Sequence, residues 1–396
     1  MAAVIDEARP QRASLLNDPK FRSRIAQIVF VLLLVWLGYE IVHNTAANLA
    51  KLNKNFDYRF LFLWQTAGFD IIQTPIEYSR DSSYFRAILV GLLNTLIVAA
   101  LGIIFATVIG FVVGIMRLSS NWLVAKIATG YVEIVRNIPL LLQIFYWYAA
   151  VLKPLPGPRE SVNFFNLAFL SNRGLVVPKP IWGEGASFIV IALVIGCIGA
   201  YAVTRWARRR QERTGEQFHS FWTGLGLIVG LPLLAFLVMG APVTFEYPEL
   251  KGFNFAGGTT ILPELMALTL ALSIYTATFI AEIVRAGIMA VSHGQTEAAH
   301  ALGLRAQPTL RLVVIPQAMR VIIPPLTNQY LNLTKNSSLA VAIAYPDLVA
   351  MGGVVNNQSG RAVEVVLIWM AVYLSISIFT SMVMNWYNAR MRLVER

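Results

Sequence analysis

Cysteine and charge are both scarce in this sequence. Its 396 residues include one cysteine and four histidines, and 13% are charged while 57% are hydrophobic. The single cysteine, Cys197, excludes an intrachain disulfide and a metal site built from several thiolates. Soluble globular chains carry about twice this share of charged residues. With a mean hydropathy of +0.61, the composition indicates an integral membrane protein.

Several motifs typical of enzymes are missing as well. No Gly-Lys dipeptide occurs, so the chain cannot form a Walker A loop and is not expected to bind ATP in the usual way. Neither a His-Glu-x-x-His motif nor a nucleophile elbow is present. We therefore expect a protein that is not an enzyme.

The net charge of +11 does not indicate a nucleic-acid partner. Most of the basic residues are arginines, and they lie at the ends of apolar runs rather than along one basic face. Orientation in a membrane explains this distribution better than binding to nucleic acid.

Eight segments are long and apolar enough to cross a bilayer, which takes about 20 residues of helix. They are residues 25–44, 87–116, 127–152, 187–204, 221–240, 263–284, 312–334 and 365–389. The few ionisable residues inside them should face protein or water rather than lipid. The first segment could instead be a signal peptide cleaved after residues 45–47, but its long, partly acidic leader is unusual for one.

The loops that carry arginine and lysine set the expected orientation, because short cytoplasmic loops retain these residues. Basic residues precede the first span, and Arg117 and Lys126 lie between the second and third. Five arginines crowd residues 205–213 between the fourth and fifth spans. We therefore expect both termini to be cytoplasmic.

Residues 291–304, VSHGQTEAAHALGL, predict a short helix between the sixth and seventh spans. Ser292 can cap its start, with Gln295 reaching back in a capping box. Gly303 can take the left-handed conformation that ends a helix. The segment is too short and too polar to span a bilayer, so we expect it to lie beside the membrane on the cytoplasmic side.

The same helix invites a metal-site interpretation, since His293, Glu297 and His300 could share one face. No strong fourth ligand lies nearby, so we expect no metal here.

The spacing of this segment resembles a known family. Glu297, Ala298, Ala299 and Gly303, followed after nine residues by residues 313–316 (VVIP), are similar to the EAA loop of binding-protein-dependent ABC permeases. The pattern departs from the usual one only at two conservative apolar positions. The resemblance implies that residues 291–304 form the coupling helix, which sits in a groove of a cytoplasmic ATPase.

Further stretches resemble the polar amino-acid branch, related to histidine and glutamine permeases. These stretches are residues 91–96, 131–141, 316–328 and 333–339. The resemblance implies an all-α type I ABC importer permease domain at residues 86–390, with a core of five transmembrane helices. An N-terminal extension, residues 1–85, adds one span and an outer loop, and an insertion at residues 152–261 adds two more. The total is about eight, and this enlarged form resembles the Q-type subunit of general L-amino-acid permeases.

The resemblance also implies the partners and the activity. It implies a permease subunit of a bacterial inner-membrane importer for L-amino acids, paired with a homologous second permease subunit. A cytoplasmic ABC ATPase dimer would bind ATP and Mg, so this chain itself needs no cofactor, and a periplasmic amino-acid-binding protein would deliver the substrate. The alternative is an ion-coupled secondary amino-acid transporter, since proline-broken spans with buried acids are typical of those proteins. No convincing inverted repeat supports that alternative.

Polar residues in the sixth and seventh spans are candidates for the substrate pathway. Pro324 and Pro325 should interrupt the backbone ladder there, and a zwitterion needs polar groups at both ends. The candidates are Thr276, Glu282, Asn328, Asn332, Thr334 and Lys335. Hydrogen bonding between permease subunits is an equally good explanation for these residues. Glu133 and Arg136 are expected to form an ion pair near the inner surface.

Overall fold

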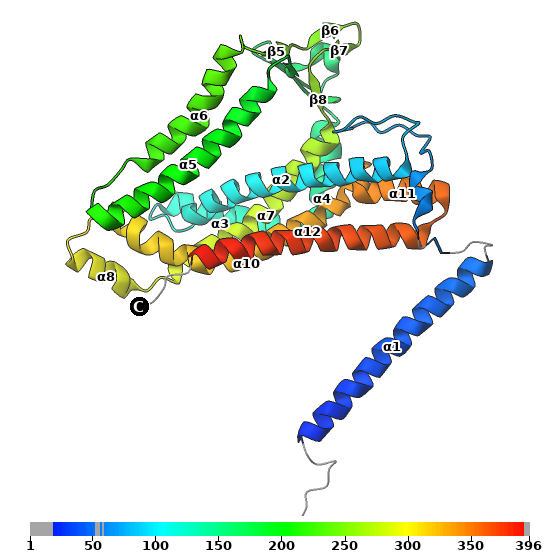
Figure 1. Cartoon of the computed structure of the whole chain (residues 1–396), viewed down its shortest axis with the longest axis horizontal. Helices are drawn as coiled ribbons and strands as arrows, with labels where there is room; N and C mark the ends of the chain where they lie inside the picture. The colour runs from blue at the N-terminus through cyan, green and yellow to red at the C-terminus, as the bar shows by residue number, and fades with distance from the viewer. Residues whose placement is uncertain (1–18, 52–55, 58, 392–396) are drawn as a thin grey trace, which may run out of the picture.

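The computed structural model describes residues 19–51, 56–57 and 59–391 of the chain. It is a bundle of long helices with a few short strands at one end (Figure 1). The chain ends, residues 1–18 and 392–396, lie outside the described residues, so the expected cytoplasmic location of the termini is not addressed by it.

Seven helices of the described chain are long and apolar enough to cross a membrane, and a bent helix pair brings the total to eight. This confirms the expected number of spans. The single-helix spans are α1 (Pro19–Lys51), α2 (Tyr84–Met116), α5 (Ser187–Thr214), α6 (Ser220–Val238), α7 (Pro263–Met289) and α12 (Ala362–Met391). The seventh is a composite, built from α9 (Ala306–Thr309), the π-helical η5 (Leu310–Val314), α10 (Ile315–Asn336) and the 3₁₀ helix η6 (Ser337–Ile343).

The segment predicted as a span over residues 127–152 is a bent pair of helices and not one straight helix. The segment consists of α3 (Trp122–Asn137), then α4 (Leu140–Phe145) running into a π-helical turn, η3 (Tyr146–Leu152), and the two parts meet at an angle of 103°. Ile138 has extended backbone angles, φ −92° and ψ 127°, directly before Pro139. A residue before proline is driven out of the helical region by the proline ring, which explains the break.

The expected interruption at Pro324 and Pro325 does not occur, because α10 remains helical from Ile315 to Asn336. The irregular turns lie at its two ends instead, in η5 and η6. The missing proline N–H groups are accommodated inside a continuous helix.

Helix α7 forms the centre of the bundle and is the most buried span. It packs along α2 and also contacts α3, α4 and α10. Small residues of α2 allow the close approach: a Cβ added to Gly110 would lie 2.6 Å from the Ile280 Cβ, and one added to Gly114 would lie 2.8 Å from the Ala281 carbonyl oxygen. In lipid no hydrophobic effect drives two helices together, so close van der Waals packing of this kind is a main source of their stability.

Eight short strands were not predicted, and they lie in the segment between α4 and α7. Strands β1 (Val162–Phe164), β2 (Ala168–Ser171), β3 (Gly174–Val177) and β8 (Thr259–Ile261) form one antiparallel sheet in the order β1-β2-β3-β8. Strand β4 (Lys179–Trp182) pairs with β5 (Val243–Glu246), and β6 (Glu249–Lys251) pairs with β7 (Asn254–Ala256). Strands β4 and β5 flank the α5–α6 hairpin, which runs downward from the strand region toward α8 in Figure 1.

Besides α8, three more short helices occur in the described chain: the 3₁₀ helices η2 (Leu61–Trp64) and η4 (Pro158–Glu160), and α11 (Leu348–Ser359), which packs on α2 and α12. Asp347 caps α11 and is fully buried, and one of its carboxylate oxygens accepts a hydrogen bond of 2.8 Å from the Ala350 N–H. Burial raises the pKa of this carboxyl to about 7.

The two ends of the bundle differ in character. Helix α8 (His293–Ala301) lies at the end where α2 leads into α3 and where α5 leads into α6, while the strands and α11 lie at the opposite end (Figure 1). Helix α1 lies apart from the bundle in the same view, and its side chains are almost all exposed.

Candidate functional site

Helix α8 begins and ends where the sequence predicts, with Ser292 at its N-cap and Gly303 in the left-handed conformation at φ +78°. The Gly303 N–H donates to the His300 carbonyl at 2.9 Å, and the Leu304 N–H donates to the Ala299 carbonyl at 3.1 Å. These two bonds make a Schellman motif, which satisfies carbonyls at the helix end.

The predicted capping box is wrong. The Ser292 side chain makes no cap hydrogen bond. The Gln295 amide oxygen instead accepts a hydrogen bond of 3.2 Å from the Gln317 amide nitrogen. Because Gln317 belongs to α10, this bond ties α8 to the composite span rather than to its own first turn.

One face of α8 is covered and another is open. Ala299 is buried, on a helix that packs against η5 and α9. Glu297 and Ala298 are exposed, and Leu302, just after the helix, is 83% exposed. This face of α8 is therefore open to solvent within the described chain.

The residues considered for a metal site do not assemble one. No group of three or more His, Cys, Asp or Glu side chains that could hold a metal occurs in the described part of the chain. The His300 Nδ1 instead lies 3.0 Å from the Leu304 carbonyl oxygen.

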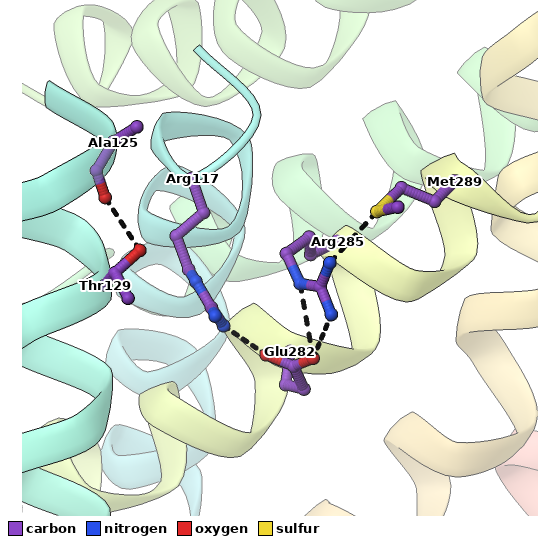
Figure 2. A network of polar contacts seen from close by, with 6 residues as sticks. All are labelled: Arg117, Ala125, Thr129, Glu282, Arg285 and Met289. Atoms are coloured by element: carbon purple, nitrogen blue, oxygen red, sulfur yellow. Dashed lines mark hydrogen bonds and ion pairs between the residues drawn. The ribbon is translucent and has the colours of Figure 1, made fainter. Parts of the chain in front are cut away.

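Glu282 lies in an ion cluster close to the α8 end of α7 (Figure 2). Its carboxylate accepts hydrogen bonds from Arg117, just past the end of α2, and from Arg285, one turn further along α7. The Arg285 guanidinium reaches it at 2.5 Å and also lies 3.0 Å from the Met289 sulfur. The Arg117 guanidinium therefore joins the end of α2 to α7, while Arg285 holds the same carboxylate from within α7.

The expected Glu133–Arg136 ion pair does not form: both residues are exposed, and no ion pair joins them within the described chain. The Arg136 guanidinium lies 5.7 Å from the centre of the Phe279 ring, so α3 contacts α7 through a cation–π interaction instead.

A pocket of about 350 Å³ opens between α7 and α10. Its lining residues are Tyr275, Thr276, Phe279, Gln329, Asn332 and Asn336. Gln329, Asn332 and Asn336 carry amides, Thr276 and Tyr275 carry hydroxyls, and the Tyr275 and Phe279 rings are aromatic. The pocket therefore offers hydrogen bonds together with an apolar wall. Thr276 is near the middle of α7, which puts this wall of the pocket midway along the span.

The structure brings two of the six pathway candidates together at this pocket, Thr276 and Asn332. Asn328 and Lys335 are exposed and do not line it. Thr334 is buried and donates to the Tyr330 carbonyl at 2.8 Å, and Glu282 is held in the ion cluster.

Four lining residues were missed: Tyr275, Phe279, Gln329 and Asn336. Gln329, Asn332 and Asn336 recur at the spacing i, i+3 and i+7, which places them on one helical face. That polar stripe is visible in the sequence and could have identified Gln329 and Asn336, whereas no comparable pattern marks Tyr275 and Phe279.

Comparison with known proteins agrees with this architecture. Residues 219–393 match the family described as binding-protein-dependent transport system inner membrane component. The chain is 57% identical to the general L-amino acid transport system permease protein AapQ of Rhizobium johnstonii, over 97% of this chain and 95% of that protein. It is 51% identical to the putative amino-acid ABC transporter permease protein YhdX of Escherichia coli, over 96% of each chain. It is 44% identical to the glutamate/glutamine/aspartate/asparagine transport system permease protein BztB of Rhodobacter capsulatus, again over 96% of each. Matches of this extent do not support the ion-coupled alternative, and the chain belongs to the amino-acid ABC transporter permeases, multi-pass proteins of the inner membrane.

Proposed function

We propose that this permease imports L-amino acids and that α8 is the element through which a separate ATPase moves its spans. The observation that carries the proposal is the open face of α8 at Glu297, Ala298 and Leu302. The helix follows α7 after a few residues and is hydrogen-bonded to α10, so a push on it reaches both walls of the pocket.

The end that carries α8 is taken to be cytoplasmic. Arg117 caps the end of α2, Lys126 lies in the first turns of α3, and the arginines of residues 205–213 lie in the last turns of α5. These helix ends are at the α8 end of the bundle in Figure 1. The retention of these basic residues on one side follows the distribution of basic residues in membrane proteins. On this orientation both termini are cytoplasmic, and the strand region faces the periplasm.

The remaining components follow from the absence of a Walker A motif in this chain. An ATPase dimer binds ATP and Mg and docks on α8, with Glu297, Ala298, Ala299 and Gly303 as the coupling residues. A homologous second permease subunit completes the pore, and a periplasmic binding protein delivers the amino acid to the outer end. The family and the amino-acid transport named for its relatives support this assignment.

The pocket between α7 and α10 is the proposed substrate contact. Its volume of about 350 Å³ is within the range of small-molecule sites. Thr276 and Asn332, with Gln329 and Asn336, provide hydrogen bonds for the charged ends of an amino acid, and Phe279 provides apolar surface. Substrate would meet α7 and α10, the two helices that α8 links.

The test of coupling uses the backbone of Gly303. A Cβ at this position would meet no atom within 4 Å, so a substitution acts only through the left-handed φ of +78°. Valine is poorly tolerated there, whereas asparagine accepts it. In proteoliposomes containing the assembled transporter, Gly303→Val should hydrolyse ATP with uptake reduced at least about tenfold. Gly303→Asn should retain uptake.

Both variants should insert and assemble equally, as checked by the yield of the purified complex. Uptake by Gly303→Val at the level of Gly303→Asn would contradict the role of α8.

A further inference from the structure

The end of α5 extends beyond the hydrocarbon layer. The helix has 28 residues, so it is about 42 Å long at 1.5 Å per residue, whereas the hydrocarbon core is about 30 Å thick. If Ser187 marks one boundary of that core, the opposite boundary falls near Ala207. Arg208 and Arg209, which follow that boundary directly, therefore lie near the depth of the lipid phosphates.

Three of these arginines share one face. Arg205, Arg208 and Arg209 follow the i, i+3, i+4 spacing, and Arg205 and Arg209 are about half a turn from the buried Ala207. They line a hollow of about 620 Å³ whose full lining is Tyr201, Thr204, Arg205, Arg208, Arg209 and Glu212. The hollow thus combines three guanidinium groups with one hydroxyl, one phenol and one carboxylate.

The arginines at this end differ in what they contact. Arg205 stacks on the Tyr201 ring at 5.2 Å. Arg210 is not part of the hollow, and it pairs with Glu216 at 2.5 Å and lies over the Trp206 ring at 5.5 Å. Arg208 and Arg209, within the part of the chain that the structure describes, have no hydrogen bond, ion pair or ring contact. Two guanidinium groups of the hollow are therefore free to bind an anion.

Aromatic side chains mark the same depth. Trp206 is 51% exposed, and Phe221 and Trp222 at the start of α6 are 70% and 68% exposed. Exposed tryptophans at the end of a span are typical of the membrane–water interface. Protein surface at this level meets lipid headgroups first.

We propose that Arg208 and Arg209 bind the phosphate of an anionic phospholipid, in the leaflet on the α8 side of the membrane. Guanidinium groups match phosphate oxygens with paired hydrogen bonds, which lysine cannot reproduce. Arg205, held against Tyr201, adds charge beside them. The acyl chains would then run along α5 from Tyr201 toward Ser187, over exposed apolar residues such as Ile198 and Val194. The α5–α6 hairpin packs mainly on itself, so a bound lipid would contribute to its position in the bilayer.

The test compares two charge-matched double variants of the assembled transporter, purified in neutral detergent. Phosphatidylglycerol is titrated in and binding is read by native mass spectrometry, with phosphatidylcholine as the reference lipid. If each of the two arginines that contact the phosphate contributes about fivefold, Arg208→Gln with Arg209→Gln should weaken phosphatidylglycerol binding about 25-fold. Arg210→Gln with Arg213→Gln removes the same charge from the same helix end and should change it by less than about twofold.

Each other outcome overturns the proposal. Equal losses in the two double variants would show diffuse attraction without a site, and no loss in either would show that these arginines do not bind lipid. Competition by millimolar inorganic phosphate would identify a site for free phosphate. Dissociation of the ATPase from the Arg208/Arg209 variant, with phosphatidylglycerol still bound, would identify a protein surface. If a double variant fails to assemble, Arg209→Gln alone should show a fivefold loss.

Discussion

Replacing Gly110 by alanine tests the tight contact between α2 and α7. The added Cβ would lie 2.6 Å from the Cβ and Cγ2 of Ile280 and 3.1 Å from the Ala277 carbonyl oxygen. Non-bonded carbons rest at about 3.5–4.0 Å, so about 1 Å of clearance is missing. A Cβ atom and a backbone oxygen cannot rotate away, so the two helices themselves must separate.

The cost follows from that separation. A gap of about 1 Å forfeits up to about half of the dispersion energy of each contact that it opens. Overpacked sites of this kind lose about 1–3 kcal/mol, which corresponds to a melting midpoint lower by about 3–10 °C.

Two other glycines provide a graded comparison. A Cβ at Gly102 would meet the end of the Leu333 side chain at 3.0 Å, and that group can rotate away, so Gly102→Ala should cost less than about 1 kcal/mol. A Cβ at Gly130 of α3 would meet nothing within 4 Å, so Gly130→Ala should be neutral or stabilising by up to about 1 kcal/mol. Thermal unfolding of the purified chain in detergent, followed by tryptophan fluorescence, would rank the three variants. A melting midpoint for Gly110→Ala at or above that of Gly130→Ala would refute the close-packing argument.

Three further predictions concern single polar side chains. Asn332→Ala should lower amino-acid uptake by the reconstituted transporter about tenfold, because a hydrogen bond to a charged group is worth about 1.5–3 kcal/mol. Asn328→Ala, one turn away and outside the pocket, should leave uptake unchanged. Glu282→Gln leaves two guanidinium groups without their carboxylate and should lower the free energy of unfolding by about 1–3 kcal/mol. Glu133→Gln, the control, should leave it unchanged. Equal melting curves for the two variants would contradict the role of Glu282 in holding both arginines. Because burial raises the pKa of Asp347 from 3.8 to about 7, its stabilising contribution is complete below about pH 4 and is lost as the pH rises through 7. The melting midpoint should therefore fall between about pH 4 and pH 7, and Asp347→Asn, which still caps α11, should remove that part of the slope.

The long spans could be predicted because their apolar runs are set by bilayer thickness. Residues 87–116 are free of charge, and the helix found there differs by only three residues at its start. The bend at Pro139 was missed because hydropathy is continuous across it, although the effect of a proline on the residue before it was a usable signal. The strands of three or four residues were missed since they are too short to show a clear alternation.

The candidate site was only partly predictable from the sequence. The cap at Gly303 depends on neighbouring residues alone and was confirmed, whereas Gln295 found a distant partner in Gln317 that no local pattern reveals. Asn328 and Asn332 are equivalent by spacing, but only Asn332 lines the pocket that α10 shares with α7. The rotation of α10 about its own axis decides which of the two asparagines lines the pocket, and that rotation depends on tertiary packing.

The pairing of β3 with β8 places Val177 beside Thr259, so the polypeptide leaves and re-enters the bundle at adjacent points. Residues 178–258, between these two strands, therefore form an insertion whose two ends lie side by side. Its length can change, or the α5–α6 hairpin can be exchanged for a simple turn, without altering the direction in which the chain enters α7. The transport core and the hairpin are therefore free to diversify at separate rates among permeases that share this architecture.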